Sequence, residues 1–161
     1  DTDIIGVDLS APCPKLAAAE AAKAQARNIR FVQANAEATG LEPDSVDVVT
    51  STMLLHEMPP PAIRCLLSES YRLLEPGGRM SHLDFYLLDD PFRRFMHYSH
   101  SHRNNAPYMQ QLAELDLVEE LGNVGFINIR IEPFEEASGA LAQSNQAWRF
   151  PWTVITAEKP S

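Results

Sequence analysis

The first hydrophobic segment, Ile4 to Val7, is short, rich in β-branched residues and followed by Asp8. This pattern predicts a buried parallel strand. Residues Pro14 to Arg27 are rich in Ala, Lys, Glu and Gln, which favour helices, and proline suits a first helical turn. Two further apolar segments, Ile29 to Gln33 and Val46 to Val49, predict strands because a turn-rich stretch separates them.

The second half of the chain continues the alternation. Between Pro61 and Leu74, apolar residues recur at three- and four-residue steps, which predicts an amphipathic helix ended by the Pro-Gly-Gly that follows. A strand is expected over Arg79 to Asp84, and residues 86–108 show no regular pattern. Met109 to Leu121 predicts a helix stopped at Gly122. The segments 127–131 and 152–157 predict two last strands, paired antiparallel because no crossover helix separates them.

Alternating strands and helices predict an α/β fold of the doubly wound class, with a mainly parallel sheet covered on both faces and a C-terminal antiparallel pair. The whole chain, 1–161, is expected to form a single domain. Ligands bind such sheets beyond the carboxyl ends of the strands. Asp8, Asn35, Ser51 and Asp84 follow or end predicted strands, so functional chemistry is expected there.

Composition narrows the classes of partner. The chain has 13 Lys plus Arg against 22 Asp plus Glu, a net charge of -9, which disfavours binding to nucleic acid. Cys13 and Cys65 are its only cysteines, so no disulfide framework or thiolate zinc site is expected, and a cytoplasmic location fits. No apolar run approaches the roughly 20 residues that span a bilayer, so no membrane span is expected.

Four segments, IIGVDLS, QANAEATGLEPDSVDVVTSTMLLHEM, LLEPGGRMSHLDF and ELGNVGFINIRI, follow one another along the chain. In this order they resemble class I S-adenosylmethionine (SAM)-dependent methyltransferases, in particular the small-molecule branch that includes enzymes of ubiquinone and menaquinone biosynthesis. The resemblance implies a Rossmann-like transferase, SAM as cofactor and a small-molecule methyl acceptor. It also implies that residues 86–108 form an insertion, either an acceptor pocket or a lid.

The resemblance implies five cofactor-binding residues. Asp8 would accept hydrogen bonds from both ribose hydroxyls, for which a carboxylate is well suited. Leu9 would lie against the adenine, Asn35 would take the place of the family's usual acidic residue, and the backbone of Ala36 would lie beside the ring. Ser51 would contact the methionine part of the cofactor. The alternatives are a turn aspartate at position 8, a loop asparagine at 35 and an ordinary strand-end serine at 51.

His56 is the candidate catalytic residue, because an imidazole titrates near neutrality and can take a proton from the acceptor. A structural histidine is the alternative. His97, His100 and His102 lie close together in the chain, but only the first two would share a helical face. Three ligands are the usual minimum for a metal, so no metal site is expected, and a polar pocket lining or a solvated loop are the alternatives.

Class I methyltransferases begin with a strand and a glycine-rich loop, and no Gly-x-Gly occurs among the seven glycines of this chain. In the family's strand order that strand lies between the one ending at Asp8 and the one ending at Thr50. The domain is therefore expected to be N-terminally incomplete, with a gap of roughly 10 Å, about two inter-strand spacings, in its sheet. A missing upstream segment, closure of the neighbouring strands, or a second chain would each account for the gap.

Two other functions remain open. One is a non-catalytic module that keeps the methyltransferase fold for binding or assembly. The other is an NAD-dependent dehydrogenase-like domain, in which an acidic residue also ends the second strand and binds ribose. The terminal antiparallel strand pair and the LEPGG turn argue against the dehydrogenase. A homodimer is compatible with the sequence, which does not identify the acceptor, the methylated atom or the pathway.

Overall fold

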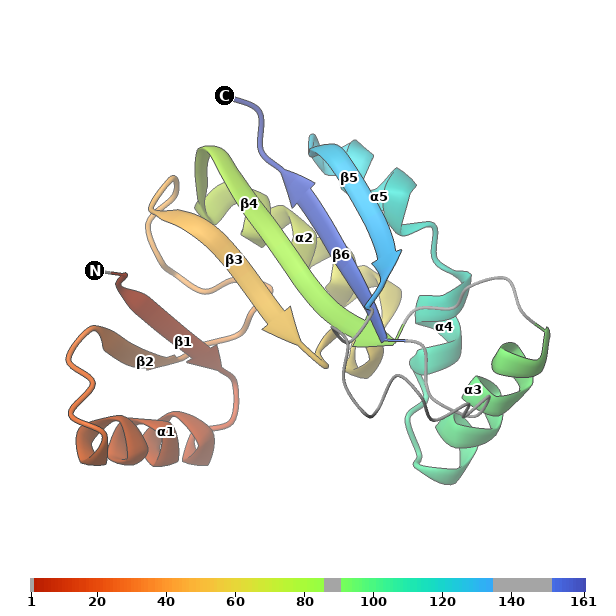
Figure 1. Cartoon of the computed structure of the whole chain (residues 1–161), viewed down its shortest axis with the longest axis horizontal. Coiled ribbons are helices and arrows are strands. Elements are labelled where there is room, and N and C mark those ends of the chain that lie inside the picture. The colour runs from red at the N-terminus through yellow and green to blue at the C-terminus, as the bar shows by residue number, and fades with distance from the viewer. Residues whose placement is uncertain (1, 86–90, 135–151) are drawn as a thin grey trace.

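The structure is a computed structural model that describes residues 2–85, 91–134 and 152–161 (Figure 1). Its elements alternate as expected, and each strand is named here with its bounds: β1 (Ile4–Asp8), β2 (Ile29–Gln33), β3 (Val46–Thr52), β4 (Leu74–Phe85), β5 (Ile127–Pro133) and β6 (Trp152–Glu158). The helices are α1 (Pro12–Lys23), the short 3₁₀ helix η1 (Leu55–Glu57), α2 (Pro60–Leu73), α3 (Pro91–Arg103), α4 (Met109–Glu114) and α5 (Leu117–Val124).

The strands form two sheets rather than one. A two-stranded sheet joins β1 and β2 in parallel, and a four-stranded sheet has the order β3-β4-β6-β5. In the second sheet β3 and β4 are parallel, while β6 is antiparallel to both β4 and β5. The mixed α/β class and the antiparallel C-terminal pair are therefore confirmed. The break lies between β1 and β3, where the sequence predicted a gap, and these two strands have not closed on one another to form a ladder.

The main hydrophobic core lies between the four-stranded sheet and the helices behind it. Figure 1 shows α2 and α5 on that side, whereas α1 lies below β1 and β2. The core combines apolar side chains of α2, α5, β4 and β6, among them Ile63, Leu67, Leu121, Met80 and Ile155. Burial of such side chains is worth about 1.5–3 kcal/mol each, so these elements form the stable part of the molecule.

The N-terminal elements are packed much less tightly. α1 contains no buried residue, and every residue of β1 and β2 is at least partly exposed. Ile4, the first residue of β1, is 45% exposed, and Val48 on β3 is 58% exposed. The segment 2–33 therefore has no hydrophobic core of its own.

One polar cluster ties the loop after β2 to the main core. The Glu69 carboxylate of α2 accepts hydrogen bonds from the backbone and side chain of Thr39, and it pairs with Arg72 at 2.7 Å. The hydrogen bond from Arg72, assisted by those from Thr39, lowers the pKa of Glu69 to about 2 although burial opposes this. The carboxylate is thus charged at neutral pH and holds the loop against α2.

The structure corrects two predictions for the segment 86–121. Residues 91–103 form helix α3, although no regular pattern was expected there. The hydrophobic periodicity of this helix is obscured because polar residues such as His97 and Ser101 occupy its buried face. The predicted helix from Met109 to Leu121 is two helices. Asp116 begins the second by accepting a hydrogen bond from the Glu119 amide at 3.0 Å, and this second helix ends at Gly125 (φ 110°) rather than at Gly122.

None of the helices in the described part of the chain has the length and apolar character needed to cross a bilayer.

The split sheet predicts unequal local stability. Because β4 is paired on both edges and β1 on one, we expect amides of β1 and β2 to exchange with solvent at least about a hundredfold faster than those of β4. Hydrogen exchange followed by mass spectrometry measures this on the wild-type chain. Equal protection in β1 and β4 would contradict the picture of a separate, weakly packed N-terminal unit.

Candidate functional site

The candidate residues gather where the parallel strands end. Figure 1 shows β1, β3 and β4 pointing in the same direction, so Asp8, Ser51 and Asp84 lie towards the same end of their sheets. The structure divides the candidates between the two sheets. Asp8, Leu9, Asn35 and Ala36 belong with β1 and β2, whereas Ser51 and His56 belong with the four-stranded sheet.

Asp8 and Asn35 lie at the same end of the two-stranded sheet. Asp8 is paired with Gln33 in register, and its carbonyl accepts a hydrogen bond from the Ala34 amide at 3.1 Å. Asn35 follows directly, and both side chains are exposed. A ligand bound beyond this end could therefore contact both of them.

Local hydrogen bonds hold these two side chains without using all their acceptor capacity. The Asp8 carboxylate accepts from the Ser10 amide at 2.7 Å, and the Asn35 side-chain oxygen accepts from the Glu37 amide at 3.0 Å. A carboxylate has about four acceptor sites and an amide oxygen has two, so each group can accept further donors. The neighbouring Leu9 is 68% exposed and offers an apolar surface beside Asp8.

Ala36 is anchored differently. Its side chain is half-buried and packs against the main core, so the chain at this point is tied to that core.

Ser51 makes a contact that the sequence did not predict. Its hydroxyl lies 2.6 Å from Nδ1 of His82, its partner across the β3–β4 ladder. His82 is 1% exposed, and burial lowers its pKa to about 4, so the imidazole is neutral at neutral pH. The Ser51 hydroxyl is therefore hydrogen-bonded to a buried neutral histidine. The backbone of Ser51 is then the group best able to contact a ligand.

His56 is buried in η1, and its Nδ1 lies 2.6 Å from Oδ1 of Asp84 at the end of β4. The other ring nitrogen, Nε2, lies 3.2 Å from a carboxylate oxygen of Glu57. Burial by itself lowers the pKa of His56, but the hydrogen bond and charge of Asp84, together with the charge of Glu57, raise it overall. The residue is thus a buried imidazole between two carboxylates, an arrangement suited to holding a proton.

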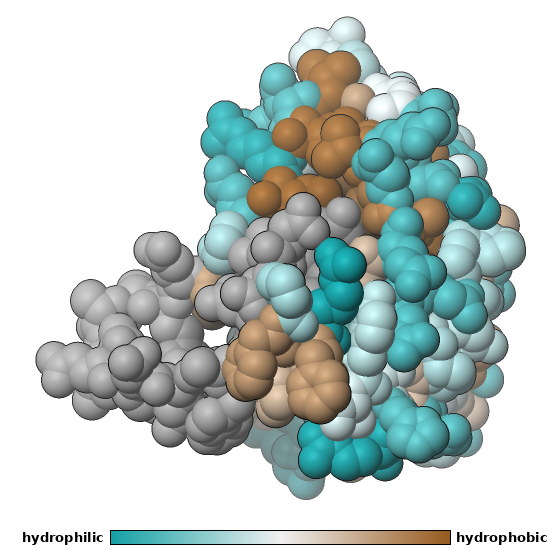
Figure 2. Space-filling model, turned by 90° about the vertical axis from the view of Figure 1, so that its right-hand side faces the viewer, coloured by the Kyte–Doolittle hydropathy of each residue, from teal (hydrophilic) through white to brown (hydrophobic). Residues whose placement is uncertain are grey.

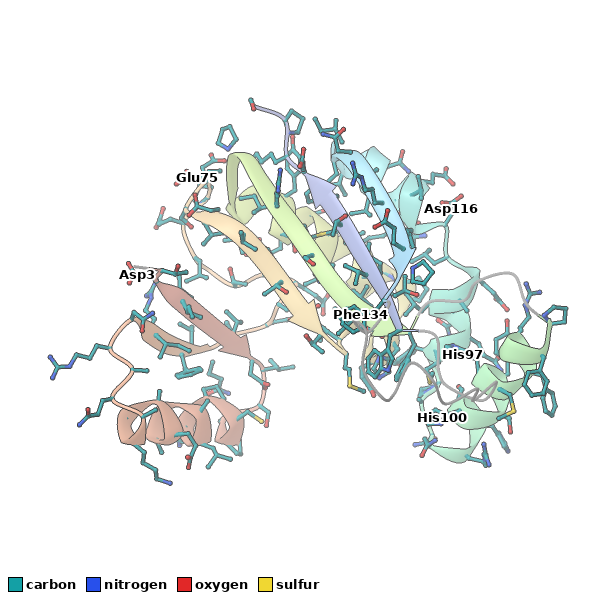
Figure 3. The ribbon with its side chains drawn as sticks, in the orientation of Figure 1. Asp3, Glu75, His97, His100, Asp116 and Phe134 are labelled. Atoms are coloured by element: carbon teal, nitrogen blue, oxygen red, sulfur yellow. The ribbon has the colours of Figure 1, made fainter. Side chains whose placement is uncertain are left out.

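Aromatic and histidine side chains surround this pair. The Phe85 ring lies 5.0 Å from that of His56 and 4.6 Å from that of Trp152. Helix α3 brings His97 and His100 to the end of the sheet where β4 finishes (Figure 3). The pKa values of both are lowered, chiefly by burial, so neither competes with His56 for a proton near neutral pH.

The helix α3 also forms part of the outer surface. Figure 2 looks onto the side of the molecule that carries α3 and α5, where hydrophobic side chains gather in patches surrounded by hydrophilic ones. Phe92 and Phe95 are exposed, and a shallow depression is lined by Pro91, Arg94, Phe95 and Tyr98. Residues 86–90 of the expected acceptor pocket or lid lie outside the described residues, so that role of 86–108 stays a prediction.

The three clustered histidines do not converge on one point. His97 is buried with Nε2 3.3 Å from the Met109 carbonyl, whereas His102 is exposed. Within the described ranges, no group of three or more histidine, cysteine or carboxylate side chains is arranged to hold a metal.

The sequence missed the partnership of His56 with Asp84 and the burial of His82. One signal was present, because His82 and Asp84 are two residues apart on a strand and therefore face the same side as Met80, which is apolar. Polar residues on an inward face must be hydrogen-bonded. That rule points to buried partners but does not say which residues they are.

Residues 1–78 match the family described as a methyltransferase domain. Over 64 residues the chain is 42% identical to the ubiquinone/menaquinone biosynthesis C-methyltransferase UbiE of Rhizobium leguminosarum bv. trifolii, a match that covers 40% of this chain and 24% of that relative. The chain thus spans about a quarter of the length of the curated relative it matches.

Solved structures agree over almost the whole chain. A protein of Bacillus halodurans assigned as a methyltransferase has a TM-score of 0.75 at 18% identity, covering 99% of this chain and 84% of that one. Phosphoethanolamine N-methyltransferase 2 of Haemonchus contortus, solved in complex with S-adenosyl-L-methionine, has a TM-score of 0.66 at 20% identity, covering 98% and 43%. At these identities the likeness shows the fold alone.

The chain has the fold of the solved SAM-dependent methyltransferases, and its residues 1–78 are similar to a methyltransferase domain, so the resemblance seen in the sequence is confirmed. The relatives matched in sequence include C-methyltransferases of ubiquinone/menaquinone biosynthesis. The dehydrogenase alternative finds no support in these matches.

The depressed pKa of His82 gives a testable pH dependence. An unfolded histidine takes up a proton near pH 6.5 but the folded one only near 4, so the free energy of unfolding decreases as the pH falls between these values, by on the order of 3 kcal/mol. We expect His82→Gln to lose this decrease, measured by urea unfolding at about pH 7 and about pH 4.5.

The exposed His102→Gln is the matched control and should keep the wild-type pH dependence. If His82→Gln and wild type lost the same stability between the two pH values, His82 would not be the neutral buried group described above.

Proposed function

We propose that this chain binds SAM and takes part in methyl transfer to a small-molecule acceptor. The observation that carries the proposal is the placement of Asp8 and Asn35 at one end of the parallel β1–β2 pair, both exposed and both with acceptor capacity left. Such an end is where doubly wound sheets bind nucleotides. The family match over residues 1–78 covers this whole region.

The residues fit the adenosine part of the cofactor. The Asp8 carboxylate can accept from two adjacent hydroxyls, the exposed Leu9 side chain can cover one face of a purine, and the Asn35 amide can accept from its exocyclic amine. Asn35 lacks the charge of the family's usual acidic residue, which favours weaker binding. Because the Ser51 hydroxyl is hydrogen-bonded to His82, the Ser51 backbone is proposed to contact the methionine part of the cofactor.

SAM supplies a methyl group on a sulfonium, an electrophile strong enough that transfer depends largely on alignment. His56 is proposed as the general base that takes the acceptor's proton. The sequence match with a ubiquinone/menaquinone C-methyltransferase favours a reduced quinone precursor as the acceptor to test first. A cytoplasmic location is also proposed, and a homodimer stays a prediction that light scattering would test.

The alternative function is a non-catalytic module for binding or assembly. A module of this kind would keep the fold without binding the cofactor. Cofactor binding therefore separates the two functions.

We expect isothermal titration calorimetry to detect SAM binding to the chain, and Asp8→Ala to weaken it roughly ten- to a hundredfold, since hydrogen bonds to charged groups are worth about 1.5–3 kcal/mol. Asp3→Ala is the matched control, because Asp3 precedes β1 at the end opposite to Asp8 (Figure 3). Wild-type protein that fails to bind SAM would favour the non-catalytic module. Equal losses in both variants would exclude a specific role for Asp8.

For the catalytic step, we expect His56→Gln to lower kcat roughly a hundredfold while leaving SAM affinity within a factor of about two, since general bases contribute about 10²–10⁴ in rate. Transfer of a radiolabelled methyl group from SAM to a short-chain quinol precursor measures this. Unchanged kcat in a folded variant would show that His56 is structural, the alternative raised from the sequence.

A further inference from the structure

The carboxylate of Asp84 is the most completely enclosed charged group in the described part of the candidate site. Its side chain has 0% exposure. Oδ2 accepts from the Leu55 amide at 2.7 Å, while Oδ1 accepts from the Phe85 amide at 2.7 Å and lies 2.6 Å from Nδ1 of His56. Two backbone amides from different elements thus fix the carboxylate before it meets the imidazole.

This geometry determines which ring nitrogen carries hydrogen. A carboxylate oxygen accepts, so Nδ1 of His56 must be the donor whether or not the ring is charged. The lone pair of the neutral ring is then on Nε2. The tautomer and orientation of a histidine are commonly fixed in this way by the partner of its other nitrogen.

The environment of Nε2 differs from that of Nδ1. It faces Glu57, whose side chain is 62% exposed and belongs to the same short helix η1. The two can share a hydrogen bond only when Nε2 is protonated, because a neutral Nε2 and a carboxylate are both acceptors. The exposed Glu57 is therefore placed to stabilise the ring after it has taken a proton and to pass that proton to water.

We propose that Asp84 is the positioning residue of His56: it holds the neutral ring as the Nδ1–H tautomer, so that Nε2 is the atom that accepts the proton of the methyl acceptor, with Glu57 on its exit path. In this step the acceptor's O–H or C–H bond breaks as its electron pair attacks the methyl carbon, and the proton forms a bond to Nε2. The proposal rests on the proposed function, because only an acceptor bound near His56 supplies that proton.

The charged groups around His56 set the pH at which this can occur. They are Asp84 from β4, Glu57 from η1, and His97 and His100 from α3. The two carboxylates outweigh burial and raise the pKa of His56, whereas burial lowers those of His97 and His100. Base catalysis requires the neutral ring, so the rate should rise as the pH passes upward through the raised pKa of His56 and then reach a plateau.

The first test needs no methyl acceptor. Nitrogen-15 NMR of the wild-type chain with labelled histidine should show the neutral His56 protonated at Nδ1, the minor tautomer of free histidine. Its assignment comes from the His56→Gln variant. A neutral ring protonated at Nε2 would overturn the proposal outright.

Two variants then separate the carboxylates. Asp84→Asn should lower the pKa of His56 and remove the preference for Nδ1–H, whereas Glu57→Gln should lower the pKa and keep that preference. Asp47→Asn makes the same chemical change at an exposed position of β3 and should alter neither. An unchanged His56 titration in a folded Asp84→Asn variant would also overturn the proposal. If that variant does not fold, the wild-type tautomer and Glu57→Gln decide.

Kinetic measurements distinguish a positioning role of Asp84 from a purely structural one. With methyl transfer as the readout, Asp84→Asn should lower the plateau of kcat roughly ten- to a hundredfold and move its acid limb to lower pH, with the KM for SAM unchanged. A loss of kcat with no movement of the limb would mean that Asp84 is only structural. If the wild type neither binds SAM nor transfers methyl groups, the proposed function fails, while the NMR result on the Asp84–His56 pair is still obtained.

Discussion

Hydrogen bonding on both edges of β4 is the constraint on which the rest of the structure depends. This strand pairs in parallel with β3 and antiparallel with β6, so its position is fixed from two sides. Its alternation then places Met80 in the hydrophobic core and His82 and Asp84 on the same inward face. Ser51 hydrogen-bonds Nδ1 of His82, and His56 and two backbone amides hydrogen-bond the Asp84 carboxylate, whereas Nε2 of His82 has no partner among the described residues.

Under the proposed function, the two chemical tasks fall in regions of different packing. Groups suited to holding an adenosine lie on the lightly packed β1–β2 sheet, whereas groups suited to handling a proton lie in the densely packed sheet around β4. A base must be held in one orientation and one tautomer, which a buried site can impose. Ribose hydroxyls need only exposed acceptors, which a strand end provides even where little is buried.

Much of the fold could be predicted from local pattern. The strands β1, β2, β3, β5 and β6 and the helices α1 and α2 fall where apolar periodicity and turn residues indicate, with ends that differ by a few residues. The failures were at α3 and at the break between α4 and α5. In α3 the buried face is polar, as His97 and Ser101 show, and the break depends on Asp116 acting as a cap, which the periodicity of its neighbours concealed.

By itself, the sequence determined the order of elements, the resemblance to class I methyltransferases and the position of Asp8, Asn35, Ser51 and His56 near strand ends. These follow from properties of neighbouring residues along the chain. Only the tertiary structure decided that His56 pairs with Asp84, that the Ser51 hydroxyl pairs with His82, and that β1 and β3 belong to different sheets. Each of these depends on residues far apart in the chain, and local propensity carries no information about which distant groups will pair and which will not.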